Sequence, residues 1–329
     1  MPADRTPQTP LARPKAKLTA LRAFLCLLAL ALPLAGGNYL HFLLASVLVY
    51  TLVGLGMVVL TGWGGYISIG HAALWAVGAY GGAVLETRLG VPFMLAVPLA
   101  GLIAALFGAL IALPALRVQG HYLAIATLGF AVLLQQVLFE WESLTGGRQG
   151  LFVPRPSVFG VELENDFGYV YLLMAIVAVA VWLLSNFRRS PTGRSLLMLK
   201  ASPIAAQCGG ASRAYHLFLA FTLSAFLTGV SGALYGPLIG FLSTETFTLA
   251  TSVAFLTLVV VGGVESLWGA LLGAIFLTFA PELLRSFKGG QTVIYGVVLM
   301  LCIHVLPGGL ASLPTQLRDA WRRRKGSAS

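Results

Sequence analysis

Few residues of this chain could take part in chemistry, and the densest group of them lies in the segment 61–73. Thr61, Ser68 and His71 are separated there by glycines and apolar residues. Polar side chains that persist in strongly apolar surroundings usually line a cavity or hydrogen-bond to a neighbouring helix. The segment is therefore either part of a substrate pathway or a helix junction in which His71 only packs. The candidate pathway residues, which include a glycine pair at a similar place in the second half, are Thr61, Gly65, Ser68, His71, Gly262 and Gly263.

Side chains for catalysis or metal binding are not grouped anywhere in the sequence. No base stands beside a nucleophile, and the phosphate-binding loop Gly-x-x-x-x-Gly-Lys-Ser/Thr is absent. The three cysteines, Cys26, Cys208 and Cys302, are widely spaced, which argues against a disulfide framework. No His is placed with them at the spacing of zinc ligands, which argues against a zinc site. We therefore expect no catalytic residues, no metal and no cofactor bound by this chain. If ATP drives the protein, a partner subunit must bind it.

The composition excludes a water-soluble domain. Of 329 residues, 58% are hydrophobic and only 10% are charged, and the mean hydropathy is +0.88. Only helices and closed barrels satisfy every backbone polar group inside a bilayer, and the long apolar runs lack the strict alternation of a barrel. The 38 glycines suit helices that approach closely in lipid. We expect an all-α, polytopic transmembrane helical bundle.

The net charge of +10 is placed as in a membrane protein rather than as in a nucleic-acid binder. Segments 1–22, 188–213 and 318–325 each hold five of the 21 Lys and Arg residues. Cytoplasmic loops carry such an excess of positive charge. The stretch 140–166 instead holds five acidic residues against two arginines. The charges predict that 188–213 and 140–166 face opposite sides of the membrane, and they give no reason to expect a nucleic-acid partner.

The hydropathy pattern predicts ten spans, because each crossing needs about 20 apolar residues. They lie at about 20–36, 40–60, 66–87, 92–116, 121–140, 168–187, 215–240, 248–263, 267–284 and 292–310. Ten crossings place both termini on the cytoplasmic side, as short basic tails at 1–19 and 317–329 around a transmembrane domain at 20–316. The loop 188–214 is then cytoplasmic and the loop 141–167 periplasmic. The first run also resembles a signal peptide, and we expect it to stay as an uncleaved span.

Two further features concern the architecture within the membrane. The halves 40–140 and 215–310 each contain four predicted spans and would run in opposite senses, which suggests an inverted repeat with the pathway between the halves. The segments 248–263 and 267–284 are short, so we expect these helices to be tilted, broken or partly re-entrant.

The cytoplasmic loop contains a clear helix signal. Ser202 is a good N-cap, and Pro203 fits the first helical position, where its missing N–H costs nothing. Residues 204–208 continue for one or two turns until Gly209-Gly210 ends them. The sequence therefore predicts a short helix with a small-residue face. It is either a docking surface for another protein or simply a connector between two spans.

Several blocks resemble a known family. Ala205-Ala206, three residues and then Gly210 resemble the cytoplasmic Ala-Ala-x-x-x-Gly signature of bacterial ABC-importer permeases. The chain is similar to the high-affinity branched-chain amino acid permeases of the LivM type in blocks at 62–74, 219–226, 229–235, 260–274 and 295–310. The resemblance covers most of the chain. It departs from the family at Ile204, where an acidic residue is common, at Glu265, where glycine is usual, and at Ala270, where proline is common.

The resemblance implies a permease of the bacterial inner membrane that moves branched-chain amino acids by alternating access. It also implies a second, LivH-like permease chain, cytoplasmic ATPase subunits that bind ATP and Mg, and a periplasmic or lipid-anchored binding protein. Ala206 is expected on the face that docks with the ATPase. The residues implied for this coupling are Ser202, Pro203, Ile204, Ala205, Ala206, Gly209, Gly210 and Arg213. Two alternatives remain open at this point: an ABC permease for urea, short amides or aromatic carboxylates, and a self-contained ion-coupled carrier.

Overall fold

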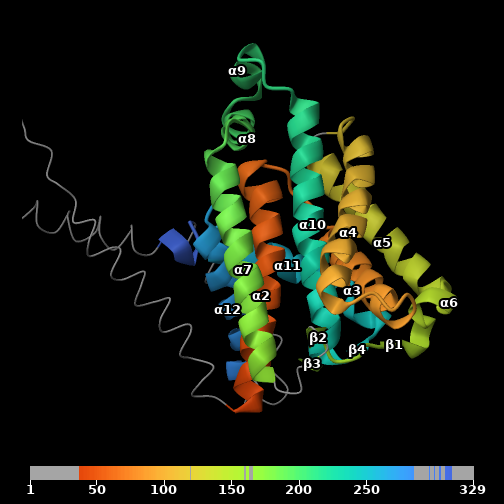
Figure 1. Cartoon of the computed structure of the whole chain (residues 1–329). Helices are drawn as coiled ribbons and strands as arrows, with labels where there is room; N and C mark the ends of the chain where they lie inside the picture. The colour runs from red at the N-terminus through yellow and green to blue at the C-terminus, as the bar shows by residue number, and fades with distance from the viewer. Residues whose placement is uncertain are drawn as a thin grey trace, which may run out of the picture.

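The computed structural model describes residues 37–118, 120–158, 161–162, 166–284, 296, 300, 304 and 308–312, which form a bundle of helices (Figure 1). The longer helices are α2 (Asn38–Met57), α3 (His71–Thr87), α4 (Phe93–Ala115), α5 (His121–Glu140), α7 (Asp166–Arg189), α10 (Arg213–Ile239), α11 (Leu249–Gly262) and α12 (Leu267–Leu284). The shorter ones are the π-helix η2 (Val58–Trp63), α6 (Glu142–Thr145), α8 (Pro191–Ala201), α9 (Pro203–Cys208), and the 3₁₀ turns η3 (Gly147–Gln149), η4 (Thr244–Thr246) and η5 (Leu310–Ser312). The predicted all-α class is confirmed.

Six helices in the described part of the chain are long and apolar enough to cross a membrane. They are Asn38–Trp63, Phe93–Ala115, His121–Glu140, Phe167–Arg189, Arg213–Ile239 and Leu267–Leu284. The shorter helices α3 and α11 correspond to two more predicted spans. The predicted span 20–36, and most of 292–310, lie outside the described residues, so the count of ten stays a prediction.

Helix α3 begins inside the bundle rather than at its surface. After η2 the chain continues without helical structure through residues 64–70, and α3 starts at His71. The His71 imidazole contacts Ser224, which lies near the middle of the 27-residue helix α10. The predicted span 66–87 therefore consists of a non-helical segment followed by a 17-residue helix that begins at His71. Three of the seven residues in 64–70 are glycines, but hydropathy alone did not give the residue at which α3 begins.

Helix α11 has the same form in the second half. It follows α10 after the strand β4 (Phe241–Leu242) and the turn η4, and it is only 14 residues long. Its first turn reaches the start of α3, because the Ala72 N–H donates a hydrogen bond to Ser252 Oγ at 3.1 Å. The predicted short span 248–263 is thus a 14-residue helix whose first turn contacts α3, and its re-entrant character stays a prediction.

The two halves pack as an inverted repeat. Helix α2 is antiparallel to α10, since Ser231 Oγ donates to the Val49 carbonyl at 2.7 Å, while Gly56, seven residues further along α2, lies against Ser224, seven residues earlier in α10. Helix α10 packs on α3 and α4 of the first half. Its counterpart α2 packs on α11 and α12 of the second half. Each pair of equivalent helices runs in opposite directions, as in transporters built from inverted halves. The fourth member of the second half would be 292–310, most of which lies outside the described residues.

Glycines bring the backbones of the two halves into contact. A methyl group on Gly78 of α3 would overlap the main chain of Gly229 in α10, and one on Gly62 would overlap the Val264 carbonyl. Such close approach is what small residues provide between helices in lipid. The halves are therefore fitted to each other at both the middle and one end of the bundle.

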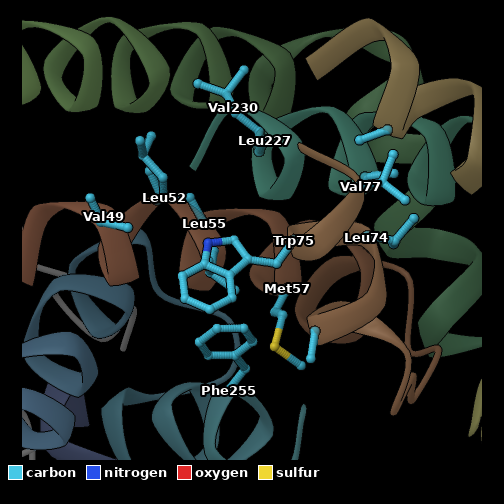
Figure 2. Packing of buried hydrophobic residues seen from close by; sticks show 14 of the residues in the cluster. Val49, Leu52, Leu55, Met57, Leu74, Trp75, Val77, Leu227, Val230 and Phe255 are labelled. Carbon is cyan, nitrogen blue, oxygen red and sulfur yellow. The ribbon is translucent and has the colours of Figure 1, made fainter. Parts of the chain in front are cut away.

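An aromatic cluster fills the space where the two short helices meet. Trp75 of α3 is 1% exposed, and its ring lies 5.1 Å from that of Phe255 in α11 at 90° (Figure 2). Tyr235 and Phe247 pack against the same indole at 4.4 and 5.1 Å. Aromatic pairs in these tilted and edge-to-face arrangements contribute about 0.5–1.5 kcal/mol each beyond their burial. The cluster fixes the deep ends of α3 and α11 against α10.

The two ends of the bundle carry different polar segments (Figure 1). Helices α8 and α9 lie at one end, and the loop 141–167 lies at the other. That loop contains α6 and three short strands, β1 (Leu151–Phe152), β2 (Ser157–Val158) and β3 (Val161–Glu162). Strand β1 pairs antiparallel with β4, and β2 with β3. The sequence predicted neither these strand pairs nor α8, but it did predict opposite ends for the two loops.

Candidate functional site

Helix α9 is the most protruding element of the described chain (Figure 1). Ser202 is its N-cap, and the hydroxyl accepts a hydrogen bond from the Ala205 N–H at 3.4 Å, with Pro203 at the first helical position. The helix ends at Gly209, and Gly210 follows with φ +84°. A positive φ favours glycine over residues with a Cβ. The predicted short helix is present, with the predicted first and last residues.

The exposed face of α9 differs from the predicted one. Ile204 is 78% exposed and Ala205 is exposed, whereas Ala206 is only 5% exposed. The Ala206 carbonyl also accepts a hydrogen bond from the Ala211 N–H, so this residue faces the turn that leads into α10. Ala206 is therefore not on the exposed side of α9 in this structure, and its role in docking stays a prediction. A protein approaching from outside would meet Ile204 and Ala205.

Arg213 joins this segment to the bundle. It is the first residue of α10, after the N-cap Ser212. Together with Pro203, Lys200 and Gly65 it lines a cavity of about 390 Å³ beneath α9. Gly65 has φ +74°, which favours glycine here, and its Cα lies close to the Lys200 side chain. The structure thus brings one predicted pathway residue next to two predicted coupling residues.

Ser68 and His71 lie deeper, in a buried polar cluster. The His71 Nε2 is 2.9 Å from Ser224 Oγ, and both residues are fully buried. Ser68 Oγ accepts from the Gly70 N–H at 3.3 Å, and the neighbouring Ile69 N–H donates to Thr127 Oγ1 at 3.0 Å. These bonds hold the non-helical segment 64–70 against α5 and α10. Most polar groups of the cluster are paired within the protein, but the buried His71 Nδ1 has no hydrogen-bond partner there.

Serines of the second half complete the polar contacts of α3, and sequence reasoning missed them. Ser224 and Ser231 lie on α10, and Ser252 lies on α11. Ser231 Oγ accepts from the Trp75 indole at 3.2 Å while donating to a carbonyl of α2. Single serines in apolar helices were the available signal, because buried hydroxyls need partners.

The remaining candidates serve packing in this conformation. Thr61 Oγ1 donates to the Tyr66 carbonyl at 3.1 Å, which closes the end of the π-helix η2. Gly262 lies against the backbone of Gly269 and Gly273 in α12, and Gly263 has φ +122°. Of the six candidate pathway residues, Gly65 lines the cavity beneath α9, while Gly263 lines a separate cavity beside Glu265. Their role in a pathway stays a prediction.

Inverted halves, short helices that begin at mid-depth, and a capped helix projecting from one end define a multi-pass membrane transport protein. Comparison with known proteins identifies the kind. The chain belongs to the family described as the permease component of branched-chain amino acid transport systems, whose model matches residues 39–306. It is therefore a multi-pass protein of the inner membrane, and the resemblance found in its sequence is confirmed.

Individual relatives agree with this assignment. The high-affinity branched-chain amino acid permease protein LivM of Salmonella typhimurium is 33% identical over 287 residues, covering 80% of this chain and 68% of LivM. LivH of the same organism is 25% identical over 80% of this chain and 92% of LivH. The autoinducer 2 import permease LsrC of Klebsiella pneumoniae is 30% identical over 61% of this chain and 57% of LsrC. No solved structure matches the chain.

Proposed function

We propose that this chain is the permease subunit of an ATP-driven importer that moves branched-chain amino acids across the inner membrane. The observation that carries the proposal is α9, a capped helix that projects from the bundle with Ile204 and Ala205 exposed. The chain has no phosphate-binding loop of its own. A projecting helix with an apolar tip suits docking in a cleft of a separate ATPase subunit, which would bind ATP and Mg.

The inverted repeat supports alternating access as the mechanism. The two short helices α3 and α11 meet at mid-depth through the Ala72–Ser252 hydrogen bond, while their other ends point to opposite ends of the bundle. Rocking one half against the other about this contact would open first one end and then the other. Thr61, Gly65, Ser68, His71, Gly262 and Gly263 would border the path.

The partners follow from the family. Both LivM and LivH match this chain, which supports a pair of related permease chains. We infer a LivH-like second permease, two cytoplasmic ATPase subunits and a periplasmic or lipid-anchored binding protein. From the basic segments we infer that α9 and both termini lie in the cytoplasm and the loop 141–167 in the periplasm. Branched-chain amino acids are the substrates named for LivM and LivH, and LsrC is named for a different solute.

The test is to change the exposed tip of α9. Ile204→Glu and Ala205→Glu should each abolish co-purification of the ATPase subunits and uptake of radiolabelled leucine, because a charge at the centre of an apolar contact costs about 2 kcal/mol or more. Leu89→Glu is the matched control, since Leu89 is 67% exposed in the turn after α3, where the neighbouring Arg88 contacts Leu144 of the loop 141–167. Normal ATPase binding by both α9 variants would refute the proposal. Substrate identity is tested separately, by calorimetry of leucine with the cognate binding protein.

A further inference from the structure

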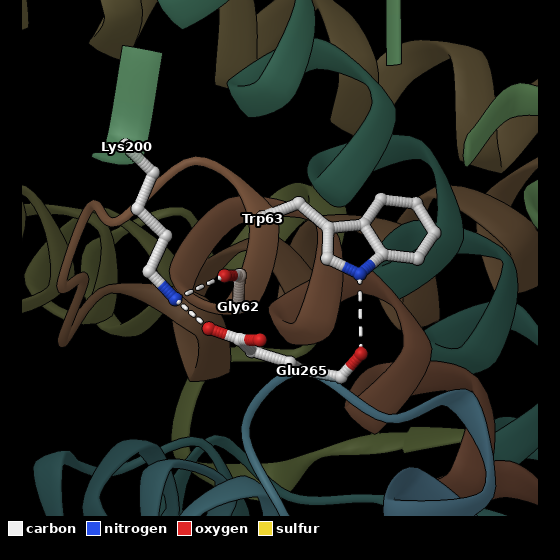
Figure 3. Close-up of polar contacts among 4 residues, drawn as sticks. All are labelled: Gly62, Trp63, Lys200 and Glu265. Carbon is white, nitrogen blue, oxygen red and sulfur yellow. Dashed lines mark hydrogen bonds and ion pairs between the residues drawn. The ribbon is translucent and has the colours of Figure 1, made fainter. Parts of the chain in front are cut away.

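Lys200 joins three segments that are far apart in the sequence (Figure 3). Its ammonium Nζ donates a hydrogen bond to the Gly62 carbonyl at 2.6 Å and forms an ion pair with Glu265 Oε1 at 2.5 Å. Glu265 is held a second time, because the Trp63 indole donates to its main-chain carbonyl at 3.3 Å.

The three segments belong to different parts of the molecule, namely the helix before α9, the first half and the second half. Lys200 lies in the last turn of α8, two residues before the N-cap of α9. Gly62 lies in η2, at the end of the long helix of the first half. Glu265 lies in the turn between α11 and α12 of the second half. A single side chain therefore connects the segment that carries α9 to both halves of the inverted repeat.

Gly62 and Trp63 are closely packed against their neighbours in the bundle. The main chain of Gly62 leaves no space for a methyl group beside Val264. The Arg188 guanidinium lies 5.8 Å from the centre of the Trp63 ring, and Phe187 stacks on the same ring at 6.3 Å. The end of α7, which leads into α8, thus rests on the residue that holds Glu265. Movement of α8 and α9 would therefore displace the end of α7 and the end of η2.

The electrostatics favour a contact that forms and breaks. The Gly62 carbonyl is at the negative end of a helix, where an ammonium group is favoured. The Lys200 and Glu265 side chains are 30% and 61% exposed, so water competes for both charges. Exposed ion pairs contribute little to stability. A weak, charge-assisted contact between moving parts is suited to exchange during a transport cycle rather than to holding the fold.

We propose that Lys200 is a positioning residue for transport: its bonds to Gly62 and Glu265 transmit movement of α9 to both halves of the pathway. The inference rests on the proposed function, since it assumes that an ATPase moves α9. In this proposal Lys200 converts movement of α9 into a rearrangement of the two halves, and Lys200 takes no part in docking.

The experiment compares Lys200→Met, Lys200→Arg and Arg117→Met in the reconstituted complex of both permease chains, the ATPases and the binding protein. Arg117 is exposed after α4 at the same end of the bundle, so its variant removes an equal charge there. For each variant, leucine uptake and ATP hydrolysis are measured together. Lys200→Met should keep the ATPases bound but lower uptake per ATP hydrolysed by about fivefold or more. Lys200→Arg should restore most of this ratio, and Arg117→Met should not change it.

Three results would overturn the inference: an unchanged ratio in Lys200→Met, an equal loss in Arg117→Met, or release of the ATPases by Lys200→Met. The last would make Lys200 a docking residue. These outcomes are distinct from failure of the proposed function, which would appear as ATPase binding that withstands both Ile204→Glu and Ala205→Glu. Glu265→Gln supplies a second variant, which keeps the hydrogen bond and removes the charge, and its ratio should fall less than that of Lys200→Met.

Discussion

His71 in the first half and Ser224 in the second half are hydrogen-bonded across 2.9 Å, with both side chains fully buried. The residues are 153 positions apart in the chain. This bond sets the depth at which α3 begins, and so determines where the first half has its break.

Ser224→Ala should lower the free energy of unfolding by about 1–3 kcal/mol, because it leaves a buried imidazole nitrogen without its partner. Thermal or denaturant unfolding of the purified protein in detergent measures the change. Ser185→Ala is the control, since the Ser185 hydroxyl bonds only to the Trp182 carbonyl of its own helix in an exposed place. Equal stability of the Ser224 and Ser185 variants would contradict the importance of this contact.

The contact between α3 and α10 at Gly78 predicts a steep dependence on side-chain size. Gly78→Ala should destabilise the protein by about 1–3 kcal/mol, since the added methyl group overlaps the Gly229 main chain. Gly129→Ala, on α5 with open space around its Cα, should instead be neutral or stabilise by about 0.5–1 kcal/mol. Gly78→Ala should therefore lower the melting temperature while Gly129→Ala should not, and an equal decrease in both would count against the packing described.

The end of α9 offers a matched pair of adjacent glycines. Gly210→Ala forces a Cβ into the left-handed region at φ +84°, whereas Gly209, at φ −82°, has room for a methyl group. The strain costs about 1–2 kcal/mol, so ATPase binding by Gly210→Ala should weaken about 5- to 30-fold. Gly209→Ala should bind almost normally. Titration of the ATPase subunit on the immobilised permease measures both, and equal affinities would show that the shape of this turn does not matter for docking.

Local signals account for what the sequence could predict. The Ser202-Pro203 start and the Gly209-Gly210 stop are cap residues whose effect does not depend on the rest of the fold, so both ends of α9 were predicted correctly. Long apolar runs likewise predicted α5 and α12 to the residue. The direction of Ala206 was missed because it depends on how the turn at Ala211 folds back on the helix.

Contacts between distant segments account for what was missed. The start of α3 at His71 depends on serines more than 150 residues away, and hydropathy does not distinguish a non-helical segment from a helix of equal composition. Lys200 looked like one more basic residue of a cytoplasmic loop. Its bonds to Gly62 and Glu265 span 138 and 65 positions of sequence, which no local pattern reports.

Helix α9 should lie on the cytoplasmic side of the membrane and be covered by an ATPase subunit. Cys208, the last residue of α9, has an exposed, free thiol that can report both properties. In a Cys26→Ser/Cys302→Ser background, a membrane-impermeant maleimide should label Cys208 in inside-out vesicles and not in right-side-out ones. Co-expression of the ATPase subunits should block that labelling. Labelling from the periplasmic side, or labelling that the ATPases leave unchanged, would contradict the account.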